Sequence, residues 1–193
     1  MLTGDILRFS ARRDPNRTAL IQGDVRVSYG ALWEDALRIA GAIGSLGIGK
    51  GETVAVMSGN RPEYAAIHFG NAMSGAMLVN LMPASAPEEL FAILQQTRSR
   101  LIIVEDAYQE KIATIRDRLP DLKHVVVIGE PAQDGWLAFD RFVAGQPATP
   151  PAVSLAPDDT FSMTYTGGTT GLPKGAKVSH HARFVSAYTT AIE

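Results

Sequence analysis

Residues 52–81 read ETVAVMSGNRPEYAAIHFGNAMSGAMLVNL, in which two short apolar runs, 52–57 and 76–81, lie on either side of a helical segment, 62–74. Runs that are apolar at nearly every position are typical of strands covered on both faces. The segment between them has the capping spacing of a helix start, with Asn60 three residues before Glu63. The pattern predicts a strand, a helix and a second strand parallel to the first.

The same alternation continues towards the carboxyl terminus. Ser85 and Glu88 repeat the capping spacing before a helix that should end near Thr97, and the apolar run 101–104 follows. A further helix is predicted over 107–119 and a further strand over 125–128. Repeated units of this kind predict an α/β fold with a doubly wound, largely parallel sheet flanked by helices, whose ligands gather at the carboxyl ends of the strands.

A hairpin and a helix are predicted upstream of these units. Two short apolar runs within 20–29 flank Gly23-Asp24, a dipeptide that is compatible with a hairpin turn. Ser28 can cap the next helix, which keeps helical apolar spacing from Leu32 and should end at Gly47 and Gly49.

The chain divides by composition into three parts. Residues 1–130 hold the alternating units and form the expected α/β subdomain. Residues 131–159 contain five prolines and predict a connector on the surface. Residues 160–193 begin with a strand at 161–165, continue through a loop rich in glycine and threonine, and enter the next helix.

The composition excludes several classes of function. The 18 basic and 20 acidic residues give a net charge of -2, which supplies no broad basic field for nucleic acid. The chain has no cysteine, so disulfides, thiolate catalysis and cysteine-ligated metals are excluded and the cytoplasm is the expected location. The sequence holds neither a signal-peptide core nor an apolar run of the ~18 residues that a membrane span needs.

The densest chemical signal is TGGTTGLPKG at 166–175. Its glycines free backbone N–H groups to turn towards an anion, its threonines add hydroxyl donors, and Lys174 adds a positive charge. This combination predicts a polyphosphate site, and the alternative is a flexible turn with a solvated lysine. It differs from the P-loop of nucleotide hydrolases, because Gly175 follows Lys174 where that motif has a hydroxyl residue.

The four histidines do not predict a metal site. His68 and His124 are isolated, and no carboxylate stands near any histidine at ligand spacing, so any Mg²⁺ is expected to arrive with the phosphates of ATP. His180 and His181 follow the loop and could cap or begin the next helix.

The stretch YTGGTTGLPKGAKVSH, residues 165–180, closely resembles the signature loop of the adenylate-forming acyl-CoA synthetases, which usually reads YTSGTTGxPKG. Earlier stretches at 27–32, 49–55 and 75–80 resemble other amino-terminal motifs of that superfamily in the expected order. The resemblance covers essentially the whole chain. It implies the amino-terminal part of an ATP-dependent acid–CoA ligase, which activates a carboxylic acid, expected to be a fatty acid, as acyl-AMP and transfers it to coenzyme A.

The resemblance also implies roles for individual residues. It assigns phosphate binding to the loop. It also makes His180 a candidate contact with substrate, because this position precedes a helix that flanks the acyl pocket in similar enzymes. Gly167 stands where the family usually has serine, which removes one hydroxyl from the expected phosphate contacts. The implied phosphate-binding residues are Thr166, Gly167, Gly168, Thr169, Thr170, Gly171 and Lys174.

Members of that superfamily also need later residues for the ribose, the adenine, the hinge and a mobile carboxyl-terminal lysine. Residues 1–193 alone are therefore expected to be catalytically incomplete. Two alternatives stay open: a non-catalytic nucleotide-binding module, and a fragment that self-associates through a sheet edge and an apolar face left uncovered.

Overall fold

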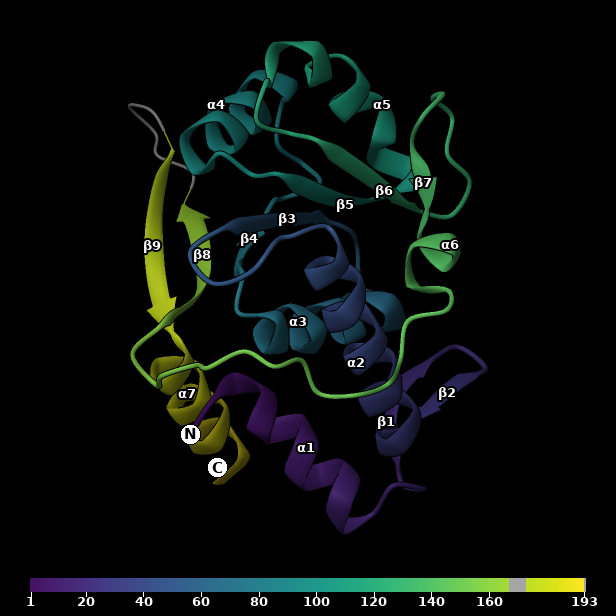
Figure 1. Cartoon of the computed structure of the whole chain (residues 1–193), viewed down its shortest axis with the longest axis vertical. Helices are drawn as coiled ribbons and strands as arrows, with labels where there is room; N and C mark the ends of the chain where they lie inside the picture. Colours follow the sequence, from purple (N-terminus) through teal and green to yellow (C-terminus); the bar gives the residue numbers. More distant parts are fainter. Residues whose placement is uncertain (167–172, 193) are drawn as a thin grey trace.

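The computed structural model describes residues 1–166 and 173–192, and its centre is a seven-stranded sheet (Figure 1). The strand order is β7-β6-β5-β3-β4-β8-β9, with every neighbouring pair parallel except β8 and β9. The strands of this sheet are β3 (Thr53–Met57), β4 (Met77–Asn80), β5 (Leu101–Glu105), β6 (His124–Ile128), β7 (Leu137–Ala138), β8 (Thr160–Thr166) and β9 (Lys174–Ser179).

Helices cover both faces of the sheet, so the α/β, doubly wound and largely parallel fold predicted from the sequence is confirmed. Figure 1 shows α4 and α5 on one face and α2 and α3 on the other, with α1 and α7 beyond them beside the two termini. The α-helices are α1 (Thr3–Arg13), α2 (Tyr29–Ser45), α3 (Pro62–Ser74), α4 (Pro87–Thr97), α5 (Gln109–Ala113), α6 (Phe139–Val143) and α7 (His180–Ile192).

The apolar runs of the sequence form the middle of this sheet. Every residue of β3 is buried, and so are residues 101–104 of β5 and 125–128 of β6. Alternate side chains enter opposite layers: Val54 and Ile103 pack under α2 and α3, whereas Ala55 and Ile102 pack under α4 and α5. Continuous hydrophobicity was therefore the correct signal for strands covered on both faces.

The predicted hairpin is confirmed as β1 (Thr18–Gln22) and β2 (Val25–Ser28), an antiparallel pair. Gly23 has φ 56°, a left-handed conformation that glycine adopts without strain. The Ser28 hydroxyl accepts a hydrogen bond from the Ala31 N–H at 3.2 Å, which confirms the predicted cap of α2.

The predicted caps of α3 and α4 are wrong. Arg61, not Asn60, is the N-cap of α3, and Ala86, not Ser85, is the N-cap of α4. Neither cap makes a side-chain hydrogen bond. A proline stands at the start of each helix, where its fixed φ suits the first turn and its missing N–H removes one unpaired donor. The prolines thus shift each helix start by one residue.

The continuous helix predicted over 107–119 is also wrong. The chain forms a 3₁₀ turn at Asp106–Tyr108, the short helix α5, and a second 3₁₀ turn at Arg116–Arg118. Ile112, Ile115 and Leu119 are nevertheless buried on one side, as their spacing predicted. Pro120 disfavours helical geometry at Leu119, so the segment ends in a tighter turn.

The stretch 131–159 contains more structure than a connector needs. β7 pairs with β6, and α6 buries Phe139 and Phe142 against the layer of α2 and α3. Residues 144–159 then cross to β8, which joins the same sheet beside β4. The subdivision into 1–130, 131–159 and 160–193 remains a prediction, although the first and last parts share one sheet.

Within residues 1–166 and 173–192, no helix combines the length and the hydrophobicity that crossing a bilayer requires.

Candidate functional site

The predicted phosphate loop connects β8 to β9 at the carboxyl edge of the sheet. β8 ends at Thr166 and β9 begins at Lys174, and these two residues are register partners across the antiparallel pair. The predicted site residues Gly167, Gly168, Thr169, Thr170 and Gly171 lie outside the described residues. The structure therefore brings together the two ends of the predicted site.

The neighbouring strand β4 supplies polar groups at the same edge. Asn80, the last residue of β4, is the register partner of Thr164 on β8, which is exposed. The Tyr64 hydroxyl of α3 donates to Asn80 Oδ1 at 2.8 Å, which fixes the amide beside β8. The strand that leads into the loop thus runs next to an ordered hydroxyl–amide pair.

Tyr165 anchors the β8 stem of the loop to the opposite face of the sheet. Its side chain is 9% exposed, and its hydroxyl and Gln96 Oε1 of α4 lie 3.2 Å apart. Burial of the phenol raises the pKa of Tyr165. Across the hairpin, a Cβ on Gly175 would lie 2.9 Å from Tyr165 Cζ and 2.6 Å from Met163 Sδ. The Met163 and Tyr165 side chains together occupy the space that a side chain at position 175 would need.

A second crevice lies where the strand order reverses, between the carboxyl ends of β3 and β5. Open α/β sheets commonly bind ligands at such a point. Here the Glu105 carboxylate lines the crevice and accepts hydrogen bonds from Ser58 Oγ at 3.0 Å and from the Gly59 N–H at 2.8 Å. Arg61 pairs with Glu105 at 3.6 Å and with Glu63 at 3.1 Å. Because this site is acidic and its charges are already paired, it disfavours phosphate, and the turn between β8 and β9 stays the predicted polyphosphate site.

His180, the predicted substrate-side residue, lies at the start of α7 and is only 1% exposed. Its Nδ1 accepts a hydrogen bond from the Thr3 N–H at 3.3 Å and lies 3.2 Å from the Thr3 hydroxyl. Burial lowers the pKa of His180, while Asp159 and Asp5 act in the opposite direction. In this chain the ring joins α7 to α1, and its contact with substrate remains a prediction.

His68 lies on α3 and packs against β8. Its ring meets the Phe161 ring edge to face, with centroids 4.8 Å apart, and Phe161 also contacts the His180 ring at 5.5 Å. Burial lowers the pKa of His68 to about 4, with a smaller contribution from the positive charge of Arg183. The strand that carries the loop therefore rests on a neutral histidine at pH 7.

This arrangement predicts an acid-sensitive fold. Because the pKa of His68 is lower in the folded chain than its usual 6.5, the folded state binds fewer protons below pH 6.5. Its stability contribution is complete above that pH and is lost as the pH falls towards 4. Between pH 7 and pH 5 the loss should be about 2 kcal/mol, measured by urea unfolding at both pH values.

His68→Gln isolates this effect from the titration of the carboxylates. The variant should lose clearly less stability than the wild type between pH 7 and pH 5, while His181→Gln, at an exposed position of α7, should behave like the wild type. Equal losses in wild type and His68→Gln would contradict the assignment.

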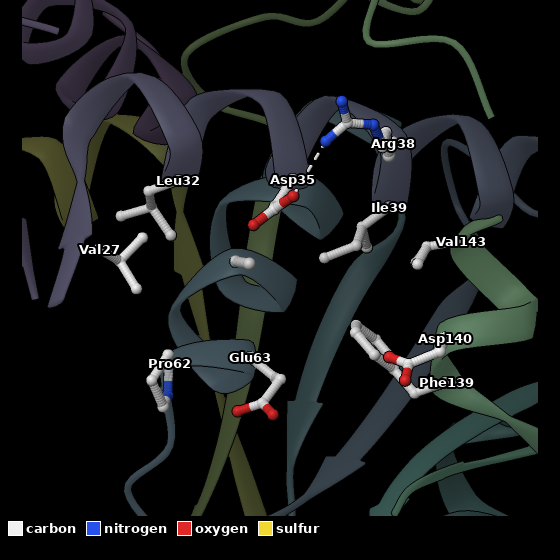
Figure 2. A pocket seen from close by; sticks show the side chains of 11 residues that line it. Val27, Leu32, Asp35, Arg38, Ile39, Pro62, Glu63, Phe139, Asp140 and Val143 are labelled. Atoms are coloured by element: carbon white, nitrogen blue, oxygen red, sulfur yellow. Dashed lines mark hydrogen bonds and ion pairs between the residues drawn. The ribbon is translucent and has the colours of Figure 1, made fainter. Parts of the chain in front are cut away.

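A cavity of about 210 Å³ lies away from the loop, between α2, α3, α6 and β2. Figure 2 shows apolar side chains such as Leu32, Ile39 and Phe139 facing it, with Asp35 bound to Arg38 at its rim. No predicted site residue lines it. Within the described part of the chain, no three histidine or carboxylate side chains are grouped closely enough to hold a metal ion.

The profile of a family described as AMP-binding enzyme matches residues 7–193. The chain belongs to this family of AMP-binding enzymes. The resemblance read from the loop at 165–180 is thereby confirmed at the level of the family.

Several CoA ligases are similar to this AMP-binding enzyme chain. The crotonobetaine/carnitine–CoA ligase of Salmonella enteritidis is 38% identical over 186 residues, which cover 90% of this chain and 36% of that protein. A long-chain-fatty-acid–CoA ligase of Thermus thermophilus is 32% identical over 157 residues, which cover 81% of this chain and 28% of that protein. This chain thus spans about a third of the length of the curated relatives it matches.

A solved structure shares the fold of this AMP-binding enzyme chain. The anthranilate CoA ligase AuaEII, in complex with anthranoyl-AMP, superposes with a TM-score of 0.90 at 33% identity, over 94% of this chain and 35% of that one. The names of these three relatives mention three different kinds of acid, so they agree on the family and not on a substrate.

Sequence reasoning missed the contacts that hold the stems of the loop. Gln96 carries no signal of its own, because it reaches Tyr165 across 69 positions of the chain. Glu105, in the crevice between β3 and β5, could have been identified from the sequence. A polar residue that directly follows a buried strand lies at the carboxyl edge of a parallel sheet.

Proposed function

We propose that this chain carries the ATP-phosphate loop of an acid–CoA ligase. The protein would activate a carboxylic acid as acyl-AMP and then transfer the acyl group to coenzyme A. The observation that supports this most directly is the β8–β9 hairpin, which pairs Thr166 with Lys174 at the carboxyl edge of the sheet. The family and the relatives named as CoA ligases support the same reaction class.

In the proposed reaction the loop binds and orients ATP and makes no covalent bond. Thr166, Thr169, Thr170 and Lys174, with backbone N–H groups of Gly167, Gly168 and Gly171, hold the β- and γ-phosphates together with Mg²⁺. The substrate carboxylate attacks the α-phosphorus and pyrophosphate leaves, which forms acyl-AMP. The thiol of coenzyme A then attacks the acyl carbonyl, loses its proton, and displaces AMP.

A fatty acid is the substrate that we propose, and His180 is the candidate residue on the substrate side. The long-chain-fatty-acid ligase relative favours this class, whereas the anthranilate and carnitine ligases keep aromatic and betaine acids in the test panel. Acid-dependent ATP–pyrophosphate exchange, in a chain as long as these relatives, would identify the acid. An absence of exchange with every acid would contradict activation.

Lys174→Ala tests the phosphate site in residues 1–193. We expect the variant to bind MgATP about tenfold or more weakly, because a charge-assisted hydrogen bond to phosphate is lost. NMR titration with MgATP can measure affinities down to the millimolar range. Lys177→Ala is the matched control, since Lys177 is an exposed lysine on the same strand, opposite Met163 and away from the loop.

The control should keep the wild-type affinity for MgATP. Equal losses in the two lysine variants would indicate non-specific charge attraction and would contradict the site. Wild-type chain that does not bind MgATP at all would contradict the proposed function of the loop.

Of the two alternatives, a non-catalytic nucleotide-binding module and a self-associating α/β module, the exposed surface favours the second. β9 is an edge strand of the sheet, and Val185 and Tyr188 of α7 are 43% and 61% exposed. Sedimentation of the chain as a dimer, without any binding of MgATP, would favour this alternative.

A further inference from the structure

Tyr165 lies directly outside both ends of the phosphate loop. It is the residue before Thr166 on β8, and its register partner Gly175 is the residue after Lys174 on β9. The Tyr165 ring occupies the space above Gly175, where a Cβ would come within 2.9 Å of Cζ. One aromatic ring is thus in contact with both stems.

The Tyr165 ring is also held by contacts with α4. Its hydroxyl bonds to Gln96 of α4, and its body packs in the apolar layer between the sheet and α4. The carboxyl end of α4 is in turn fixed to β3, because the Thr53 hydroxyl donates to the Thr97 carbonyl at 2.8 Å. The position of the ring is therefore set by the interior of the fold.

Gly175 makes this arrangement possible and also makes the β9 stem dependent on it. A residue without a side chain cannot anchor its strand by its own packing. Met163, two positions before Tyr165, completes the hollow, with its Sδ 2.6 Å from the place of the missing Cβ. If the Tyr165 ring were removed, the β9 stem would lose an aromatic support beside the loop.

We propose that Tyr165 is a positioning residue for the phosphate loop: its ring, held by Gln96 and seated on Gly175, fixes the separation of the two stems. This inference rests on the proposed function of the loop, and it adds to it three residues that do not touch the phosphates themselves. The separation of the stems affects phosphate binding because charge-assisted contacts to phosphate weaken when their donors move by a fraction of an ångström.

MgATP titrations of four variants test the proposal. Tyr165→Leu removes the ring and should weaken MgATP binding about tenfold. Tyr165→Phe keeps the ring and loses one neutral hydrogen bond, so a change of about two- to fivefold is expected. Gln96→Leu should match Tyr165→Phe, and the double variant should be no weaker than either alone.

Gly175→Ala, the fourth variant, places a Cβ against both the Tyr165 ring and the Met163 side chain, and it should weaken binding about as much as Tyr165→Leu does. Lys177→Ala is again the control, because this exposed lysine lies on β9 two positions beyond Gly175 and should leave the affinity unchanged.

A purely structural role is separated by measuring the free energy of unfolding of each variant. All titrations are made at a temperature where far-ultraviolet circular dichroism shows every variant to be folded. Positioning predicts a lower affinity in the folded state, whereas a structural role predicts lower stability with wild-type affinity. The second result would overturn the inference.

The two proposals fail in different ways. If the wild-type chain binds MgATP and Tyr165→Leu binds equally well, only the inference about Tyr165 is overturned. If the wild-type chain does not bind MgATP, the function of the loop and the positioning role are both overturned.

Discussion

Phe161→Ala is expected to lower the free energy of unfolding by about 3–5 kcal/mol, the range for deleting a fully buried phenylalanine. Phe161 is 0% exposed and lies on β8, where its ring contacts His68 of α3 and His180 of α7. The deletion would leave a cavity between three elements, and the two histidine rings would lose their aromatic partner. Urea unfolding at pH 7, followed by circular dichroism, measures the change.

Phe9→Ala is the matched control for this substitution. Phe9 is 44% exposed on α1, and the guanidinium carbon of Arg8 lies 5.0 Å from its ring centroid. Its loss should cost less than about 1 kcal/mol. Similar costs for the two phenylalanines would contradict the packing of β8 on α3 and α7.

Gly70→Val should destabilise the fold by at least about 3 kcal/mol, at the upper end of the usual cost of overpacking. Gly70 lies in α3 and faces Ala36 and Ile39 of α2. A Cβ there would lie 2.7 Å from the Ala36 carbonyl oxygen and 2.8 Å from Ile39 Cβ. Because one of these atoms belongs to the backbone of α2, the helices must separate to admit a side chain.

Gly44→Val provides the comparison for Gly70→Val. Gly44 lies in α2, and a Cβ there would meet no atom within 4 Å. Valine and glycine have similarly low helix propensities, so the change in the free energy of unfolding should stay within about 0.5 kcal/mol. A Gly70→Val variant as stable as Gly44→Val would show that α2 and α3 are not in close contact.

The sequence predicted the layers of this fold well because its strands are covered on both faces. Burial on both sides leaves a continuous apolar run, as at 101–104 and 125–128, and such runs are easy to recognise. The errors lie at helix ends. Pro62 and Pro87 shift α3 and α4 by one residue from the predicted caps, and Pro120 follows a segment that ends in a 3₁₀ turn.

The phosphate-binding chemistry of the candidate site stays a prediction from its glycines, threonines and Lys174, and a hairpin necessarily brings Thr166 and Lys174 together. The contacts that support the two ends of the loop could not be predicted. The contacts of Tyr165 with Gln96 and with the space above Gly175 depend on how α4 packs on the sheet. Such contacts join distant positions and leave no periodic pattern in one sequence.

The two edge strands of the sheet differ in how readily a further strand could pair with them. β7 has only two residues, whereas β9 offers six residues of backbone, with Lys174 and Lys177 along it. β7 resists the addition of a strand because it is short, whereas the longer β9 resists it through its charged side chains. Fibril growth by edge-to-edge addition would therefore proceed from β9, and high salt, which screens the lysines, should accelerate it.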